Sequence, residues 1–109
     1  MTYEGVVEML EEIRLPYAYY EFPDDTVEAP PFICFYYPAN SDFLADSSNY
    51  QKIEQLTIEL YTDYKDLELE GKVEAVLKDY GLMFSRTESY IDAERMFMIT
   101  YETEVLING

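Results

Sequence analysis

Hydrophobic and polar residues alternate in the middle of the chain in a pattern that predicts a strand followed by a helix. Leu56, Ile58 and Leu60 are separated by single polar residues, and this period of two puts the three aliphatic side chains on one face of a strand. After a polar turn comes an apolar stripe with helical spacing, made of Leu69, Val73, Val76, Leu77 and Tyr80. We expect this stripe to cover the aliphatic face of the strand.

Capping residues mark both ends of this predicted helix. Asp63 and Asp66 are two candidate N-caps, because an aspartate side chain can accept a hydrogen bond from an N–H of the first turn. Gly81 follows the last apolar residue and predicts a C-terminal cap in the left-handed region. Lys78 lies in the last turn, where a cation suits the helix dipole.

The rest of the chain predicts one more helix and four more strands. The helix is expected over residues 2–15, ended by Pro16, since the residue before a proline is pushed out of the helical region. The order α-β-β-β-α-β-β predicts an α+β two-layer sandwich, a mostly antiparallel sheet with two helices on one face. We expect a single domain over residues 1–109. The further strands are expected over residues 17–22, 32–37, 82–91 and 95–107.

Two features near the central strand leave alternatives open. Ile53 has the opposite parity from the aliphatic residues that follow it, so either a bulge intervenes or Ile53 packs on the outer face. Residues 39–49 predict a long polar loop with Phe43 and Leu44 at its centre. These two side chains either fold back into the core or are held out for a partner, and we favour the partner.

The charge balance excludes one class of function. The chain has 23 acidic and 7 basic residues, no histidine and a net charge of -16. Such a surface repels phosphates, so we expect no sequence-specific binding of nucleic acid. The acidic surface either serves solubility and partner choice or mimics nucleic acid towards a basic partner.

The residues for catalysis or metal binding are missing from the sequence. Without histidine, a serine or cysteine nucleophile lacks its usual base, and Cys34 is expected to be a small buried hydrophobic residue. The 4 glycines form no phosphate-binding motif, and no cluster fits a zinc or calcium site. We therefore expect no enzyme activity, no catalytic residues, no cofactor and no metal.

The lengths of the apolar runs and the charge of the N-terminal residues predict where the protein is located. No apolar run approaches the roughly 20 residues that span a bilayer, and the N-terminal residues are acidic where a secretory signal is basic. We expect the protein to be made in a cytoplasm and not to interact with a membrane. The single cysteine agrees with a reducing compartment of this kind.

Aromatic residues suggest a contact surface. The chain has 12 tyrosines and 6 phenylalanines, more rings than a core of this size usually holds, and tyrosine suits protein interfaces. The alternative is that the rings simply lie in strands, where aromatic residues are favoured. We expect the sheet face opposite the helices to be the contact surface. The candidate contact residues, each of which could instead belong to the core, are Phe43, Leu44, Tyr61, Tyr64, Tyr90 and Met98.

Two blocks of the sequence resemble a known family. The block LTIELYTDYKDLELEGKVEAVLKDYG, followed by SYIDAERMFMITYETEV, resembles small tail-completion or tail-terminator proteins, also called minor structural proteins, of long-tailed phages and prophages of Gram-positive bacteria. The resemblance covers most of the chain, including the N-terminal helix and the strand PPFICFYYP. Gly71 departs from it, because a charged residue is expected at that position of the helix.

The resemblance implies a virion component of the tail or of the head-tail neck. It implies a ring of identical subunits, six in number, that stops growth of the tail tube and offers a docking surface to the head-tail connector. The implied partners are therefore copies of the chain itself, the tail tube and connector proteins, with no enzyme activity and no cofactor. The alternative hypothesis, based on size and charge, is an acidic inhibitor that mimics nucleic acid, such as a phage counter-defence protein.

Overall fold

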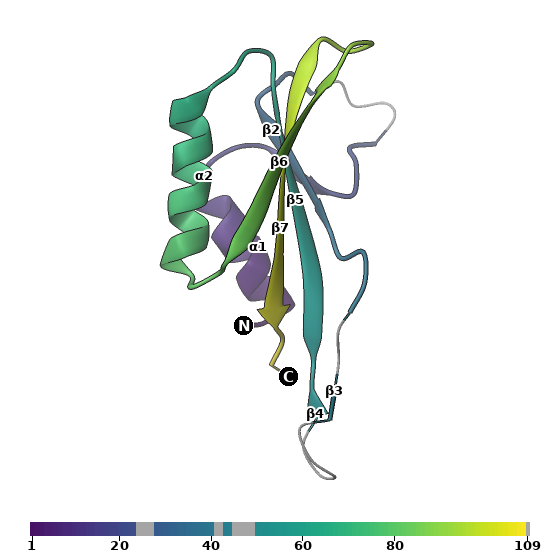
Figure 1. Cartoon of the computed structure of the whole chain (residues 1–109), viewed down its shortest axis with the longest axis vertical. Coiled ribbons are helices and arrows are strands. Elements are labelled where there is room, and N and C mark those ends of the chain that lie inside the picture. Colours follow the sequence, from purple (N-terminus) through teal and green to yellow (C-terminus); the bar gives the residue numbers. More distant parts are fainter. Residues whose placement is uncertain (24–27, 41–42, 45–49, 109) are drawn as a thin grey trace.

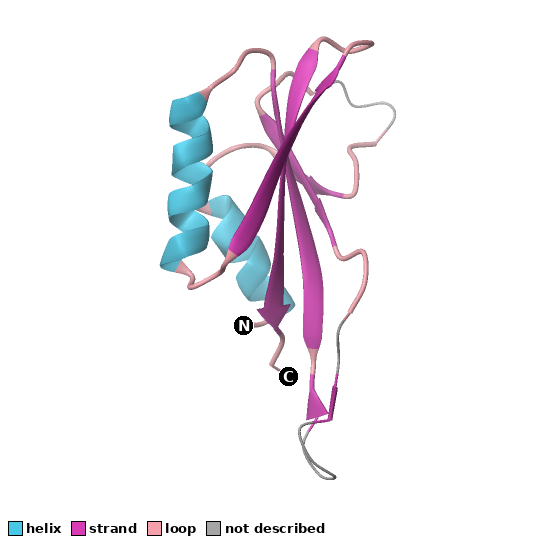
Figure 2. Ribbon diagram, viewed as in Figure 1, coloured by secondary structure: helices cyan, strands magenta, loops and turns pink. Residues whose placement is uncertain are grey.

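The computed structural model describes residues 1–23, 28–40, 43–44 and 50–108, with residues 43–44 and 50–51 described in backbone only. Both helices, α1 (Tyr3–Glu11) and α2 (Leu67–Asp79), lie on one side of the main sheet (Figures 1 and 2). This arrangement confirms the predicted α+β two-layer sandwich. The strands are β1 (Tyr17–Tyr19), β2 (Phe32–Tyr36), β3 (Phe43–Leu44), β4 (Tyr50–Gln51), β5 (Ile53–Thr62), β6 (Phe84–Ile91) and β7 (Met96–Leu106).

The main sheet has five strands in the order β1-β2-β5-β7-β6. Its pairs are antiparallel except β1 with β2, which run parallel. The pairing of β5 with β7 runs without a break from Ile53 opposite Leu106 to Thr62 opposite Phe97. No bulge therefore intervenes, and Ile53 lies on the outer face, the second of the two predicted alternatives.

Both helices begin at a residue whose side chain caps the first turn. The Thr2 side chain accepts a hydrogen bond from the Gly5 N–H at 2.9 Å, and Asp66, rather than Asp63, accepts one from the Leu69 N–H at 3.0 Å. Gly81 has a φ of 74°, as expected of a residue that ends a helix in the left-handed region.

The helix-facing side of the sheet, called the inner face below, holds the main core. Leu56, Ile58 and Leu60 of the central strand are fully buried there, and so are Val73 and Leu77 of α2, while Leu69 and Tyr80 of the predicted stripe are partly buried against them. These residues match the predicted periodicities of two and 3.6. Members of this core include Val6, Met9, Leu10, Ile13, Ile33, Leu56, Ile58, Leu60, Val73, Leu77, Ile99 and Tyr101.

Two predicted elements end earlier than expected. The first helix ends at Glu11 rather than near Leu15, and Arg14 has a φ of 64°. The first strand ends at Tyr19, and Tyr20 has a φ of 71°. A left-handed residue follows each element, two residues after the Glu12 cap of α1 and directly after Tyr19 of β1. The chain therefore turns at these points before the apolar pattern runs out.

The predicted loop over residues 39–49 was wrong in part. Asn40 forms an isolated bridge with Glu54, and β3 pairs with β4 in a small antiparallel sheet. This pair lies beyond the end of β5 and beyond the two chain termini (Figure 1). The side chains of Phe43 and Leu44, and residues 41–42 and 45–49 as a whole, lie outside what the structure describes.

A buried carboxylate joins α2 to the edge strand β6. The side chain of Glu70 is 1% exposed and forms ion pairs with Lys65 at 2.6 Å and Arg86 at 3.0 Å. Arg86 also contacts Glu74, which accepts a hydrogen bond from the hydroxyl of Tyr101 at 3.0 Å. Burial of an ionised carboxylate is unfavourable unless it is paired, and here two cations pair it.

Candidate functional site

The outer face of the sheet, turned away from the helices, is the predicted contact surface. Side chains alternate between the faces of a strand, and the strand register aligns the outward positions across the sheet. Outward side chains are Phe32, Cys34 and Tyr36 on β2, Thr57, Glu59 and Tyr61 on β5, Met96, Met98, Thr100 and Glu102 on β7, and Ser85, Thr87 and Ser89 on β6.

One half of this face carries a second, smaller core. Phe32, Cys34 and Met96 are buried together, although they lie on the side opposite the helices. The segment after β1 leaves the sheet at Tyr20 and places Phe22 against this cluster. The rings of Phe22 and Phe32 meet edge to face, with their centroids 5.4 Å apart. This small core explains why β2, whose apolar run is continuous, is buried on both faces.

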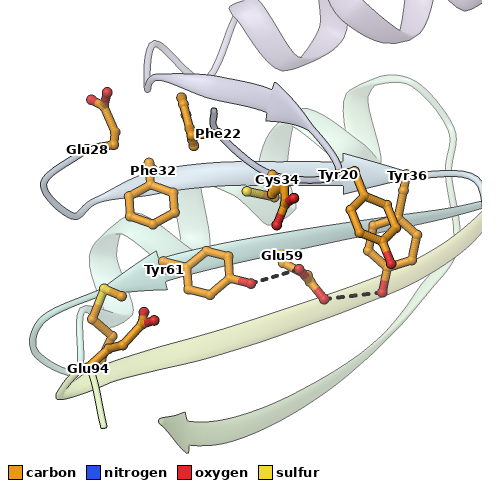
Figure 3. A pocket seen from close by; sticks show the side chains of 11 residues that line it. Tyr20, Phe22, Glu28, Phe32, Cys34, Tyr36, Glu59, Tyr61 and Glu94 are labelled. Atoms are coloured by element: carbon orange, nitrogen blue, oxygen red, sulfur yellow. Dashed lines mark hydrogen bonds between the residues drawn. The ribbon is translucent and has the colours of Figure 1, made fainter. Parts of the chain in front are cut away.

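Beside the small core is an open hollow of about 630 Å³. It lies between β2, β5 and the start of β7 on the sheet and the segment that follows β1 (Figure 3). The side chains around it are aromatic or acidic with few exceptions, and none of the described lining residues is lysine or arginine. The lining consists of Tyr20, Glu21, Phe22, Glu28, Phe32, Cys34, Tyr36, Glu59, Tyr61, Glu94 and Met96.

Glu59 holds the centre of the hollow. Its two carboxylate oxygens each accept a hydrogen bond from a tyrosine hydroxyl, at 2.8 Å from Tyr61 and at 3.2 Å from Tyr36, and Figure 3 shows the two hydroxyls directed at it from either side. Burial and then the Glu59 carboxylate raise the pKa of both tyrosines. Both hydroxyls therefore stay protonated at neutral pH and hold the carboxylate in place.

Cys34 lies in the same hollow but is not activated. Burial, with a further contribution from the charges of Glu59 and Glu21, raises the pKa of the thiol to about 11. The nucleophilic form of cysteine is the thiolate, so Cys34 is an unreactive thiol at neutral pH. This agrees with its predicted role as a small buried hydrophobic residue.

The other half of the outer face is open and polar. Ser85, Thr87 and Ser89 on the edge strand β6 are exposed, and so is Glu102 on β7. Beyond them, the Gln55 side chain donates a hydrogen bond to Glu104 at 3.1 Å. Hydroxyl and carboxylate groups of this kind suit a hydrated contact more than a buried apolar one.

The predicted contact residues are distributed over both ends of the sheet. Tyr61 and Met98 are register partners on the outer face, so the structure brings these two together. Tyr90 lies at the same end but on the inner face, 48% exposed against the ring of Phe97, and Tyr64 is 62% exposed in the turn before α2. Phe43 and Leu44 lie at the opposite end, in β3. A contact role for these six residues stays a prediction.

The hollow itself was missed by reasoning from sequence. Glu59 and Tyr61 share the polar parity of the central strand, which places them together on the outer face. Tyr36 joins them through the antiparallel pairing of β2 with β5, and Tyr20 joins them only through the turn at Tyr20 and the parallel pairing of β1 with β2. No local signal in the sequence indicates that pairing.

Neither a metal centre nor a membrane span is found in the part of the chain that the structure describes. In residues 1–23, 28–40 and 52–108, no group of three or more Cys, Asp or Glu side chains could hold a metal ion. The helices of the described chain are too short and too polar to cross a bilayer.

Comparisons with known proteins bear on the fold. No family model matches the sequence, and no curated protein matches it either. A chain in the solved structure titled "Virion of native gene transfer agent (GTA) particle" is similar, with a TM-score of 0.63 and 13% identity, over 93% of this chain and 84% of that one. At this identity the likeness establishes shared architecture, so the chain has the fold of a protein found in that virion particle.

Proposed function

We propose that this protein is a structural component of a phage or prophage virion, of the tail-terminator or tail-completion type, which acts by ring self-assembly and by docking to its neighbours. The observation that supports it most is the likeness to the gene transfer agent virion chain, because it extends over nearly the whole of both chains. A shared fold alone does not fix a function, so the surface has to fit the role as well.

The surface fits a subunit of an assembly. Edge strand β6 lies free on one side of the sheet within the described residues, and a free edge is a ready surface for pairing with another chain. The outer face adds rings and carboxylates over β2 and β5 and exposed hydroxyls on β6. Identical subunits in a ring make heterologous contacts, in which different surfaces of each copy meet.

The proposed role includes no catalysis and no cofactor. Cys34, which would be the nucleophile of choice, is held in its protonated form, and the sequence contains no histidine to act as its base. The proposed partners are copies of the chain, the tail tube and the head-tail connector, and the proposed location is the virion. The protein would bind no specific nucleic acid sequence, because its charge of -16 repels phosphates.

The charge also determines how self-assembly should be tested. Copies that each carry -16 repel one another, and about 1 M salt shortens the screening length to ~3 Å. We therefore expect light scattering after size exclusion, at high protein concentration, to show larger particles as NaCl rises from 0.05 M to 1 M. Negative-stain images of these particles should show rings.

Two substitutions with the same change in charge make this experiment specific. Met98→Asp puts a charge on the outer face, whereas Lys72→Gln changes the charge by the same amount on an exposed position of α2. Met98→Asp should abolish the large particles and Lys72→Gln should not, with unchanged far-ultraviolet circular dichroism for both. Loss of assembly in both variants would mean that net charge, and not this face, controls it.

The rival hypothesis gives the opposite results. A protein that stays monomeric at every salt concentration and displaces DNA from a basic nuclease would be a nucleic-acid mimic. A protein that stays monomeric at every salt concentration and does not displace DNA would contradict ring self-assembly without supporting the mimic.

A further inference from the structure

The hollow on the outer face offers hydrogen-bond acceptors and few donors. A tyrosine hydroxyl has one proton, and Tyr61 and Tyr36 both direct theirs at Glu59. The lone pairs of these hydroxyls and the remaining lone pairs of the Glu59 carboxylate are still available. An occupant that satisfies such a surface has to supply several donors at once.

The charge of the hollow has one sign. Glu21, Glu28, Glu59 and Glu94 line it, and its described lining contains no lysine or arginine. The contrast with Glu70 is direct, because that carboxylate is paired with two cations inside the protein. Opposite charge across an interface favours one partner over another, so the occupant should be cationic.

Aromatic rings also border the hollow. The rings of Phe32 and Tyr61 stack on each other, with centroids 4.8 Å apart and planes 21° apart, and the rings of Tyr20 and Tyr36 are tilted by 51° with centroids 5.4 Å apart. Planar cations lie favourably on aromatic faces. Figure 3 shows Glu59 between the rings of Tyr61 and Tyr36, so a carboxylate and aromatic faces border the same space.

We propose that this hollow binds an arginine side chain presented by a basic segment of a partner protein. Guanidinium supplies five donors in a planar fork, pairs with carboxylates and stacks on rings, whereas lysine is a compact point charge that does not stack. The occupant is a different protein because charge complementarity favours a basic segment, and a second copy of this chain offers only 7 basic residues against 23 acidic ones. This inference rests on the proposed function only in that the partner would be another protein of the particle.

The test is a nuclear magnetic resonance titration of the full chain with capped arginine amide at fixed ionic strength. Amide shifts should change around Glu59, Tyr61 and Phe32. Capped citrulline amide, which has the same shape and no charge, should leave them unchanged, and capped lysine amide should bind several-fold more weakly. Because the ligand is small and the titration is run at low salt, where we expect repulsion between copies to keep the protein monomeric, the result does not depend on ring formation.

Matched variants locate the site. Glu59→Gln and, separately, Glu94→Gln remove one charge within the hollow, while Glu102→Gln removes one charge from an exposed outer-face position outside it. We expect Glu59→Gln to weaken arginine binding about tenfold, as for the loss of a hydrogen bond to a charged group, and Glu102→Gln to leave it within twofold. A second hollow variant keeps the test valid if Glu59→Gln alters the fold.

Three results would overturn the proposal. Equal weakening by Glu59→Gln and Glu102→Gln would show diffuse attraction to an acidic surface. Equal binding of lysine and arginine would show that the planar fork of the guanidinium group and its stacking contribute nothing. Loss of high-salt self-association in Glu59→Gln would show that the occupant is a second copy of this chain.

Discussion

The two faces of the main sheet are built from the same strands and treat charge in opposite ways. On the inner face, the carboxylate of Glu70 is almost fully buried and two cations neutralise it. On the outer face, Glu59 is held by two tyrosine hydroxyls, which supply hydrogen bonds but no compensating charge. With 7 bases for 23 acids, cations are scarce, and two of them serve the helix-facing core. The inner face is therefore complete in the isolated chain, whereas the outer face keeps a negative charge that a partner can neutralise.

The largest expected effect concerns the apolar side chains of the two faces. Ile58 is fully buried on the inner face, and Met98 is partly exposed on the outer face. Ile58→Ala should lower the free energy of unfolding by about 2–5 kcal/mol, because it removes buried methyl groups and leaves a cavity. Met98→Ala should lower it by less than about 1 kcal/mol, since part of that surface is already hydrated. Urea unfolding measures both, and equal losses would mean that both faces are core.

The next effect concerns the buried charge. Replacing both Lys65 and Arg86 by alanine leaves the carboxylate of Glu70 buried without a cation. The side chains of Lys65 and Arg86 are 36% and 45% exposed, so solvent already screens these pairs. We therefore expect a measurable loss of stability, smaller than the loss for breaking a fully buried pair.

Adding Glu70→Gln to that double variant should recover part of the loss, because the unpaired charge is then gone. Glu59→Gln on the outer face should change stability less, because no ion pair among the described residues is lost there and the glutamine amide can still hydrogen-bond to the two tyrosine hydroxyls. No recovery in the triple variant would show that packing of Lys65 and Arg86, rather than charge, accounts for the loss.

Alkaline pH should lower the free energy of unfolding, because buried tyrosines on both faces of the sheet lose their protons. Burial raises the pKa of Tyr37 from 10.0 to about 12, and burial with a neighbouring carboxylate raises the pKa of Tyr61 and of Tyr101. The folded protein then keeps protons that the unfolded chain releases, so stability is fully present below pH 10 and falls as pH rises from 10 towards 12. The raised pKa of Cys34, from 9.0 to about 11, moves the onset of the fall to near pH 9.

Urea unfolding at a series of pH values from 7 to 11 measures this effect. Tyr101→Phe removes one group from the inner face and Tyr61→Phe removes one from the outer face, so each should make the decline shallower. A stability that rises above pH 10 would contradict the assignment of these tyrosines as groups that keep their protons in the folded state.

The sequence predicts those elements whose conformation is set by residues a few positions apart in the chain. The helix stripe, the cap at Gly81 and the terminal hairpin follow from spacings of a few residues, and the structure confirms them. The early end of α1 and the turn at Tyr20 depend on left-handed residues that have ordinary side chains. No glycine or asparagine marks either position, so the sequence does not signal them.

The candidate site was predictable as a face but not as a hollow. Alternation along the central strand predicts that Glu59 and Tyr61 point outward together. The parallel pairing of β1 with β2 and the return of Phe22 onto the outer face are contacts between distant parts of the chain. The same holds for Glu70, which is buried because Lys65 and Arg86 approach it from outside its own helix.

The smallest expected effect concerns a single hydroxyl on the inner face. Thr62 is 2% exposed at the end of β5, and its hydroxyl has no hydrogen-bond partner among the described residues. Thr62→Val keeps the branched shape that suits a strand and removes the unsatisfied group, so it should raise the free energy of unfolding by about 1 kcal/mol. The same change at Thr100, which lies partly exposed on the outer face, should alter it by less than about 0.5 kcal/mol. A destabilised Thr62→Val variant in thermal and urea unfolding would show that this hydroxyl has a bound water or another partner. The inner face would then be open to water, and the two faces would differ less than we infer.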